Sequence, residues 1–255
     1  MNSLQPVYII CQREFIRFFR EKSRIFGTLA RPVLWLLVIG NGMSALIKPQ
    51  DGFSYLQFIF PGMIAMTIMF SAILSSASIV WDREFGFMKE MLVAPISRLS
   101  IVFGKAISGT VLSVLQAVII LLLIPFLGIS VTAAKFAWVV AASVLVSFCI
   151  TSMGILIAAC IRSFEGYNVV MNFLVMPMFL FSGAMYPVTS MPQVLRQLSY
   201  LNPVTYCVDL FKHILLRNER PPAGPEFSLA FDLLIVATLS VVTMTLAVLA
   251  FKKRQ

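Results

Sequence analysis

Long stretches without a single charged residue alternate with short charged segments in this chain. Residues 55–81 and 106–134 contain no Asp, Glu, Lys or Arg. Each is longer than the roughly 20 residues that an α-helix needs to cross a bilayer. Only 12% of all residues are charged, about half the share that is typical of a soluble domain. The pattern predicts an all-α polytopic membrane protein.

The apolar runs predict six transmembrane helices behind a charged N-terminal segment. The predicted spans are residues 30–47, 55–80, 102–127, 136–161, 167–181 and 233–251. The domain organisation expected from them is an amphipathic segment at 1–27 and a six-span domain at 28–255. Because the first apolar run follows some 30 residues of charged helix, no cleavable signal peptide is expected.

The N-terminal segment is predicted to be one amphipathic helix over residues 4–26, lying in the membrane interface. Apolar residues share one side at 100° per residue, and four arginines share the other. The apolar side holds Leu4, Val7, Tyr8, Cys11, Phe15, Phe18 and Phe19, and the basic side holds Arg13, Arg17, Arg20 and Arg24. Two roles stay open for this helix, anchoring to anionic lipid and contact with a cytosolic partner.

A charged segment at residues 81–98 separates the second and third spans. It carries three acids and three bases, more than a hairpin turn requires. Phe85, Met88 and Leu92 recur at steps of three and four, which indicates a surface helix with one apolar stripe, and Pro95 ends it. We expect this helix to present its charges to an ATP-hydrolysing partner.

Residues 187–227, between the fifth and sixth spans, suit neither a simple loop nor a full span. They contain two short apolar segments, 191–201 and 204–216, separated by Asn202-Pro203. Apolar runs of 10 to 14 residues are more often re-entrant or interfacial than spanning. We expect two short helices that dip into the outer leaflet.

The distribution of bases predicts the orientation. With both termini in the cytosol, fourteen of the 20 Lys and Arg residues lie on the cytosolic side and six lie outside. The net charge of +9 is then explained by the positive-inside rule, without a nucleic-acid partner. The charged segment 81–98 becomes cytosolic.

The sequence contains no recognisable catalytic or metal motif, so neither an enzymatic activity nor a bound cofactor is expected. His213, the only histidine, has Asp209 one helical turn before it, and a surface pair between the two is predicted. Gly104-Lys105 lacks the rest of a phosphate-binding loop. The four cysteines, at positions 11, 149, 160 and 207, are scattered, and no disulfide is expected.

Ionisable residues are almost absent from the centres of the spans, which argues against a transporter driven by protons or sodium. A secondary transporter or channel remains the alternative to an ATP-driven system. Methionine and phenylalanine are abundant in the second and fifth spans, which suits a path for a greasy substrate but also ordinary packing or lipid contact. The candidate path residues are Phe58, Met63, Met66, Phe70, Phe173, Met176 and Phe179.

Two blocks of sequence resemble the ABC-2 family of ABC transporter permeases. The first is Asp82-Arg83-Glu84-x-Gly86, followed by Leu92-x-x-Pro95-x-Ser97. The second runs from Phe181 through Tyr186-Pro187 and resumes at Leu201-Asn202-Pro203 and Tyr206. The order of elements is similar over the whole chain to bacterial half-permeases of daunorubicin-resistance, nodulation-factor and polysaccharide exporters.

This resemblance implies a type V exporter-like permease in the bacterial inner membrane, paired with a second copy of itself or a related subunit. Two separate P-loop ATPase subunits would bind ATP and Mg²⁺. The coupling residues implied are Asp82, Arg83, Glu84, Gly86, Lys89, Glu90, Arg162 and Glu165, and the outer-gate residues are Tyr186, Pro187, Asn202, Pro203 and Tyr206. The substrate stays open among hydrophobic drugs, lipids and lipid-linked glycans.

Overall fold

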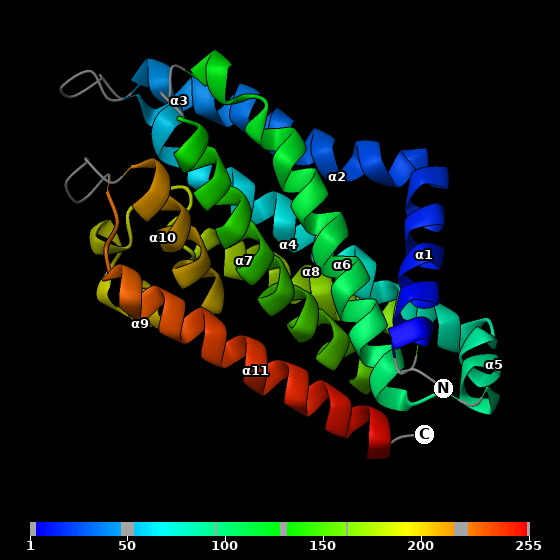
Figure 1. Ribbon diagram of the computed structural model, residues 1–255. Helices are drawn as coiled ribbons and strands as arrows, with labels where there is room; N and C mark the ends of the chain where they lie inside the picture. The colour runs from blue at the N-terminus through cyan, green and yellow to red at the C-terminus, as the bar shows by residue number, and fades with distance from the viewer. Residues whose placement is uncertain are drawn as a thin grey trace.

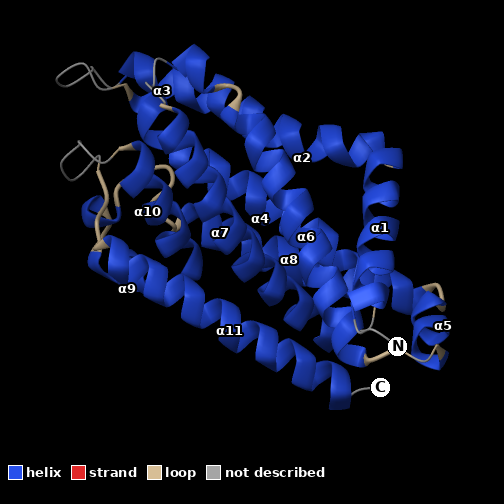
Figure 2. Cartoon of the chain, viewed as in Figure 1, coloured by secondary structure: helices blue, strands red, loops and turns tan. Residues whose placement is uncertain are grey.

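The computed structural model describes residues 4–46, 54–94, 96–127, 132–161, 163–216 and 224–253 (Figure 1). Within these residues every regular element is a helix (Figure 2), as the sequence predicts. The longer α-helices are α1 (Leu4–Arg20), α2 (Lys22–Trp35), α4 (Tyr55–Glu84), α6 (Arg98–Leu121), α7 (Ala133–Cys160), α8 (Phe164–Leu180), α10 (Pro203–Leu215) and α11 (Leu229–Lys253). Shorter ones are α3 (Asn41–Leu46), α5 (Phe87–Val93) and α9 (Gln193–Leu201). A π-helical turn at Leu36–Gly40 joins α2 to α3, and 3₁₀ turns lie at Ile124–Leu127 and Val188–Ser190.

Five helical stretches are long and apolar enough to cross a membrane. They are Ile25–Ser44, Tyr55–Glu84, Arg98–Leu121, Ala133–Cys160 and Leu229–Lys252. The fifth predicted span is α8, which is shorter and contains Pro177. At 1.5 Å per residue, its 17 residues extend about 25 Å, less than the roughly 30 Å of a hydrocarbon core.

The helix starts follow local sequence signals. Ser54 precedes α4, and its hydroxyl accepts from the backbone N–H of Leu56 while the Gln57 side chain accepts from the N–H of Ser54. Ser97 and Ser163 cap α6 and α8 in the same way, through the N–H groups of Ser100 and Gly166. These hydroxyls satisfy donors that an α-helix leaves unpaired in its first turn.

Helix α4 forms the centre of the subunit, buried along most of its length between α6 and α7. Small residues let the three helices approach closely. The Ser76 hydroxyl of α4 donates to the carbonyl oxygens of Ala72 and Thr151, at 2.8 and 3.3 Å. Gly154 of α7 faces the same serine. Close packing of small residues replaces the hydrophobic effect as the force between helices in a membrane.

Replacing Gly154 with alanine is expected to destabilise the subunit. A methyl group at this position would lie 2.4 Å from the Ser76 hydroxyl oxygen and 2.8 Å from its Cβ, so α4 and α7 must separate. Overpacking of this kind costs about 1–3 kcal/mol. Thermal unfolding of the purified chain in mild detergent measures the loss.

Two further variants separate the steric cause from a general effect of the substitution. Gly27→Ala, where nothing lies within 4 Å of the new methyl group, should leave the unfolding temperature unchanged or raise it slightly. Adding Ser76→Gly to Gly154→Ala should recover part of the loss. An alanine at 154 as stable as the wild type would contradict the close approach of α4 and α7.

The prediction of one amphipathic helix over residues 4–26 is wrong. Helix α1 ends at Arg20, and α2 begins at Lys22 and runs at a steep angle to it (Figure 1). The break lies at Glu21, whose ψ of 66° is outside the helical region. The Glu21 carboxylate accepts from Arg17 at 2.8 Å, an ion pair between the break residue and the last turn of α1.

Both termini and α5 lie at one end of the bundle, and α3, α9 and α10 lie at the other (Figure 1). The two short helices predicted between the last two spans are present as α9 and α10. They are separated at Asn202, whose side-chain oxygen accepts from the N–H of Val204, while Pro203 begins α10. None of the four cysteines, all of which lie within the described residues, forms a disulfide.

Candidate functional site

The three charged residues at the end of α4 point to three different neighbours. The Asp82 carboxylate pairs with Lys105 of α6 and with Arg13 of α1. Arg83 donates to the carbonyl oxygens of Ile161 and Ala158 at the end of α7, at 2.7 and 3.3 Å. The Glu84 carboxylate accepts from the N–H of Phe164, where α8 begins, at 3.0 Å. This end of α4 is therefore bonded to four other helices.

Glu14, Arg13, Asp82 and Lys105 form a network of two acids and two bases, which we call the charge network. The Lys105 ammonium lies 2.7 Å from Glu14 and donates to the Ser78 hydroxyl at 2.9 Å. Arg13 lies 2.8 Å from Glu14 and 2.5 Å from Asp82. Glu14 and Lys105 are only 2% and 3% exposed. These charges can be buried because the two acids balance the two bases and each carboxylate is paired with a cation.

The charge network lowers the pKa of Glu14, which lies on α1, outside the membrane-spanning helices. Burial alone would raise the pKa of Glu14, but the charges of Lys105 and Arg13 and their hydrogen bonds lower it from 4.5 to about 2. Glu14 is therefore ionised at any physiological pH. It holds α1 against α4 and α6.

Acid is expected to weaken the attachment of α1. Because the pKa of Glu14 is lower in the folded state, its contribution is complete above pH 4.5 and disappears as the pH falls toward 2. The shift corresponds to about 3 kcal/mol. The unfolding temperature of the wild type, measured from about pH 6.5 down to pH 3 in detergent, should fall more steeply than that of Glu14→Gln. Parallel curves for the two proteins would contradict this role of Glu14.

Two arginines of α1 reinforce the same contact by stacking on aromatic rings. The Arg13 guanidinium lies 4.1 Å from the ring centroid of Phe87 in α5, and that of Arg17 lies 4.4 Å from Trp81 in α4. Partly shielded cation–π contacts of this kind contribute about 1 kcal/mol. The basic side of α1 therefore packs partly against the protein, and these two arginines do not only face lipid headgroups.

A groove of about 330 Å³ lies between α1 and α5 at the end that carries both termini. Its α1 wall is formed by Gln5, Pro6, Ile9, Ile10 and Arg13, and its other wall by Phe87, Glu90, Met91, Ala94 and Ile96. Beside it, α5 exposes Lys89, Glu90 and Val93, the last to 87%. An apolar groove rimmed by charges and an exposed aliphatic side chain is typical of a protein-docking surface.

The prediction of one surface helix over 81–98 is wrong in its bounds. Helix α4 continues to Glu84, and Gly86, with a φ of 83°, turns the chain into the separate helix α5. Met88 is buried, but Phe85, expected on the same apolar stripe, is 80% exposed. Pro95 and the Leu92 side chain lie outside the described residues.

The predicted coupling residues consequently fall into two groups. Gly86, Lys89 and Glu90 belong to the surface turn and to α5. Asp82 is buried, and Arg83 and Glu84 bond to the neighbouring helices. Arg162 lies outside the described residues, and Glu165 is exposed in the first turn of α8. A role in coupling remains a prediction for all of them.

The candidate path residues also separate. Four are buried inside the subunit, namely Phe58, Met63, Met66 and Phe179, and two are exposed on α8, namely Phe173 and Met176. Phe70 lies under the guanidinium of Arg31 at 4.0 Å. In this conformation the four buried side chains pack in the core. A role for them in a substrate path remains a prediction.

Among the predicted gate residues, Asn202 and Tyr206 have defined structural roles. The Asn202 amide donates to the carbonyl oxygen of Met178 in α8 at 2.6 Å, and the Tyr206 hydroxyl donates to that of Tyr200 in α9 at 2.6 Å. Tyr186 is partly exposed next to Pro187, and Pro203 is the first residue of α10. The hydrogen bonds of Asn202 and Tyr206 join α8, α9 and α10. A role of these residues in gating remains a prediction.

Comparison with known proteins decides the family. The family model described as "ABC-2 type transporter" matches residues 5–216, which include every residue of the charge network and α5. The chain belongs to the ABC-2 transporter family.

Relatives of this ABC-2 chain are named as permeases. It is 31% identical over 240 residues to the putative transport permease ycf38 of Cyanophora paradoxa, covering 89% of this chain and 80% of that protein. It is 29% identical to the inner membrane transport permease YadH of Escherichia coli K12, covering 86% of each. It is 33% identical over 172 residues to the probable multidrug ABC transporter permease YbhR of the same strain, covering 64% of this chain and 45% of that protein. This ABC-2 chain is therefore a multi-pass membrane permease of an ABC transporter, the kind of subunit that normally lacks an ATPase site of its own.

Proposed function

We propose that the chain is the membrane subunit of an ATP-driven exporter and that α5 with the adjoining groove binds the ATPase partner. The main support is that the end of α4, which lies next to α5, is bonded to four other helices, α1, α6, α7 and α8. A force applied at α5 would be transmitted through these bonds to most of the bundle. Movement of packed helices as rigid bodies is a common way to switch access.

The orientation and assembly belong to the same proposal. Both termini, α5 and the groove lie at one end (Figure 1), and the excess of bases at that end supports a cytosolic position in a bacterial inner membrane. Six crossings, with α8 as the fifth, account for termini at the same end. Two copies of the chain with two ATPase subunits, which bind ATP and Mg²⁺, would form the transporter.

A second groove supports the proposal that the substrate is amphipathic or hydrophobic. It measures about 600 Å³ and lies between α2 and α4. Phe70, Leu74 and Trp81 supply apolar surface, and Arg31, Thr28 and Ser23 supply polar groups. A drug, a lipid or a lipid-linked glycan would meet both kinds of surface there, and the name of YbhR points to drugs for that relative.

Co-purification tests the proposal. The tagged chain is extracted from its native membrane in mild detergent, with a photo-reactive residue in place of Lys89 in one sample and of Val194, on α9 at the opposite end, in another. A P-loop ATPase should appear in about equal amount with the chain and should cross-link to position 89 only. If no ATPase is recovered with either sample after illumination, the proposed function is wrong.

A further inference from the structure

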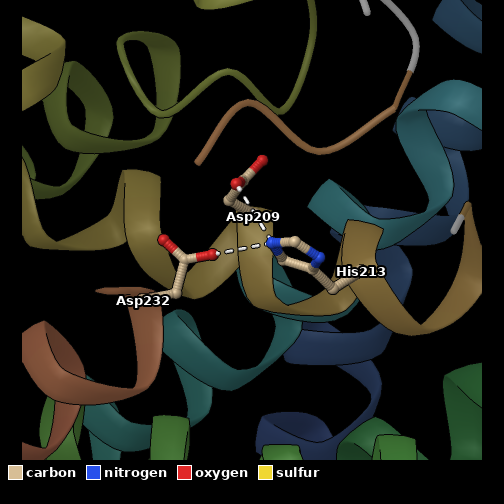
Figure 3. Close-up of side chains that lie close together, drawn as sticks. All are labelled: Asp209, His213 and Asp232. Carbon is tan, nitrogen blue, oxygen red and sulfur yellow. Dashed lines mark ion pairs between the residues drawn. The ribbon is translucent and has the colours of Figure 1, made fainter. Parts of the chain in front are cut away.

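Three side chains with metal-binding atoms converge at the end of the bundle opposite to the termini (Figure 3). Asp209 and His213 lie one turn apart on α10, and Asp232 comes from the first turn of α11. The Nε2 atom of His213 lies 3.3 Å from Oδ2 of Asp232 and 3.9 Å from Oδ2 of Asp209. The predicted pair of His213 and Asp209 is present, but it is buried and not on the surface, because Asp209 is only 2% exposed. Asp232 is the nearer partner.

The carboxylate of Asp232 is fully buried, and neither of its oxygens has a hydrogen-bond partner among the described residues. One of these oxygens points at the imidazole (Figure 3). A buried carboxylate without hydrogen bonds is costly. A positively charged ligand at this position would therefore stabilise the carboxylate of Asp232.

Asp209 is held in place for the same ligand. Its carboxylate accepts from the backbone N–H groups of Glu226 and Phe227, at 2.9 to 3.1 Å, which fixes its direction. Lys212, the nearby buried cation, has its ammonium 3.8 Å from Glu226 and is engaged there. Lys212 also attracts Asp209, so Asp232, which has the imidazole as its ion-pair partner, is the carboxylate whose charge is least compensated.

The spacing fits a small transition-metal ion. Ligand atoms about 2.0–2.2 Å from a tetrahedral zinc ion lie about 3.3–3.6 Å from one another. The 3.3 Å between Nε2 and Asp232 falls in this range, and the 3.9 Å to Asp209 requires a small shift of that side chain. The carbonyl oxygen of Phe227, 3.0 Å from the same Nε2 atom, accepts a hydrogen bond from it. A metal ion on Nε2 would displace that proton, and water would complete the coordination. A nitrogen ligand among oxygens favours zinc over magnesium or calcium.

We propose that Asp209, His213 and Asp232 bind one zinc ion that ties α10 to the start of α11. The ion would neutralise the buried carboxylates and fix the connection between the last span and the short outer helices. This site is independent of the proposed docking of an ATPase at α5, because the two lie at opposite ends of the subunit.

Zinc binding to the purified full-length chain tests the proposal. The chain carries an affinity tag without histidine, so that His213 stays the only one. It is stripped with a chelator, titrated with zinc chloride and desalted, and bound metal is measured by mass spectrometry. We expect one equivalent of zinc, a higher unfolding temperature with zinc, and loss of both in Asp232→Asn and His213→Gln.

The controls separate this site from a folding defect and from thiols. Asp232→Asn removes a buried charge that has no hydrogen bond among the described residues, together with its 3.3 Å ion pair to His213, so the metal-free variant should be about as stable as the metal-free wild type. Glu90→Gln, an exposed carboxylate at the other end, should keep the zinc. The proposal is overturned if wild type and Asp232→Asn retain equal zinc, if neither retains any, or if the zinc is lost only when the four cysteines are replaced.

Discussion

Lys105→Met is expected to release α1 from the bundle and to unfold the chain in mild detergent at temperatures that the wild type withstands. Methionine keeps the length and apolar stem of lysine but removes the ammonium that pairs with Glu14 and Asp82. Both acids are nearly inaccessible to water, and Arg13 alone is left to balance them. Removing one partner of a buried pair costs about 3–5 kcal/mol. Thermal unfolding and size-exclusion profiles measure the effect.

A matched substitution and a double variant identify the cause. Lys89→Met removes an exposed lysine of α5 and should leave the unfolding temperature unchanged. Glu14→Gln combined with Lys105→Met restores the balance between Arg13 and Asp82 and should recover much of the loss. If the double variant is as unstable as the sum of its parts, the two side chains do not interact as described.

The sequence predicts the helices well because long uncharged runs allow few alternatives in a bilayer. Their ends are set by side chains visible in the sequence, such as Ser54, Ser97 and Asn202. The break between α1 and α2 is different. No proline or glycine stands at Glu21, and the chain bends there because α1 packs on α6 while α2 enters the bundle. Tertiary packing decided this boundary.

The charge network joins residues from three separate parts of the chain, and no short motif announces it. Glu14 alone gives a sign of the network in the sequence. It lies seven residues after Val7 and four before Phe18, so it is an acid at the edge of the apolar side of α1. Lys105 lies two turns inside α6. An acid and a base on apolar faces of different helices can be recognised as partners only when the helices are placed together.

The motif Asp82-Arg83-Glu84 predicts contact with a partner, and that role remains a prediction. The structure adds a second role, because each of the three side chains bonds to another helix of the same subunit. Asp232 was missed for a related reason, since a single acid at the start of an apolar run looks like a helix-end residue. In both cases the residue type was informative, and its partner came from a distant segment.

Val93→Asp is expected to abolish association with the ATPase and ATP-driven transport while leaving the subunit folded and in the membrane. Among the described side chains of α5, Val93 is the most exposed apolar one, at 87%, so its substitution removes little packing. At an interface, a new carboxylate would be buried without a partner. Losing one central contact of this kind weakens association by at least about tenfold.

Val194→Asp is the matched control, because Val194 is also a largely exposed valine on a short helix but lies on α9 at the opposite end. Co-purified ATPase and ATP-dependent transport in membrane vesicles are compared for the two variants and the wild type. We expect loss in Val93→Asp alone, with equal amounts of all three chains in the membrane. Since Val93 lies outside the charge network, a stable variant that still binds the ATPase would place the docking surface elsewhere on the cytosolic end. Equal loss in both variants would show that the effect comes from the introduced charge in general and not from α5.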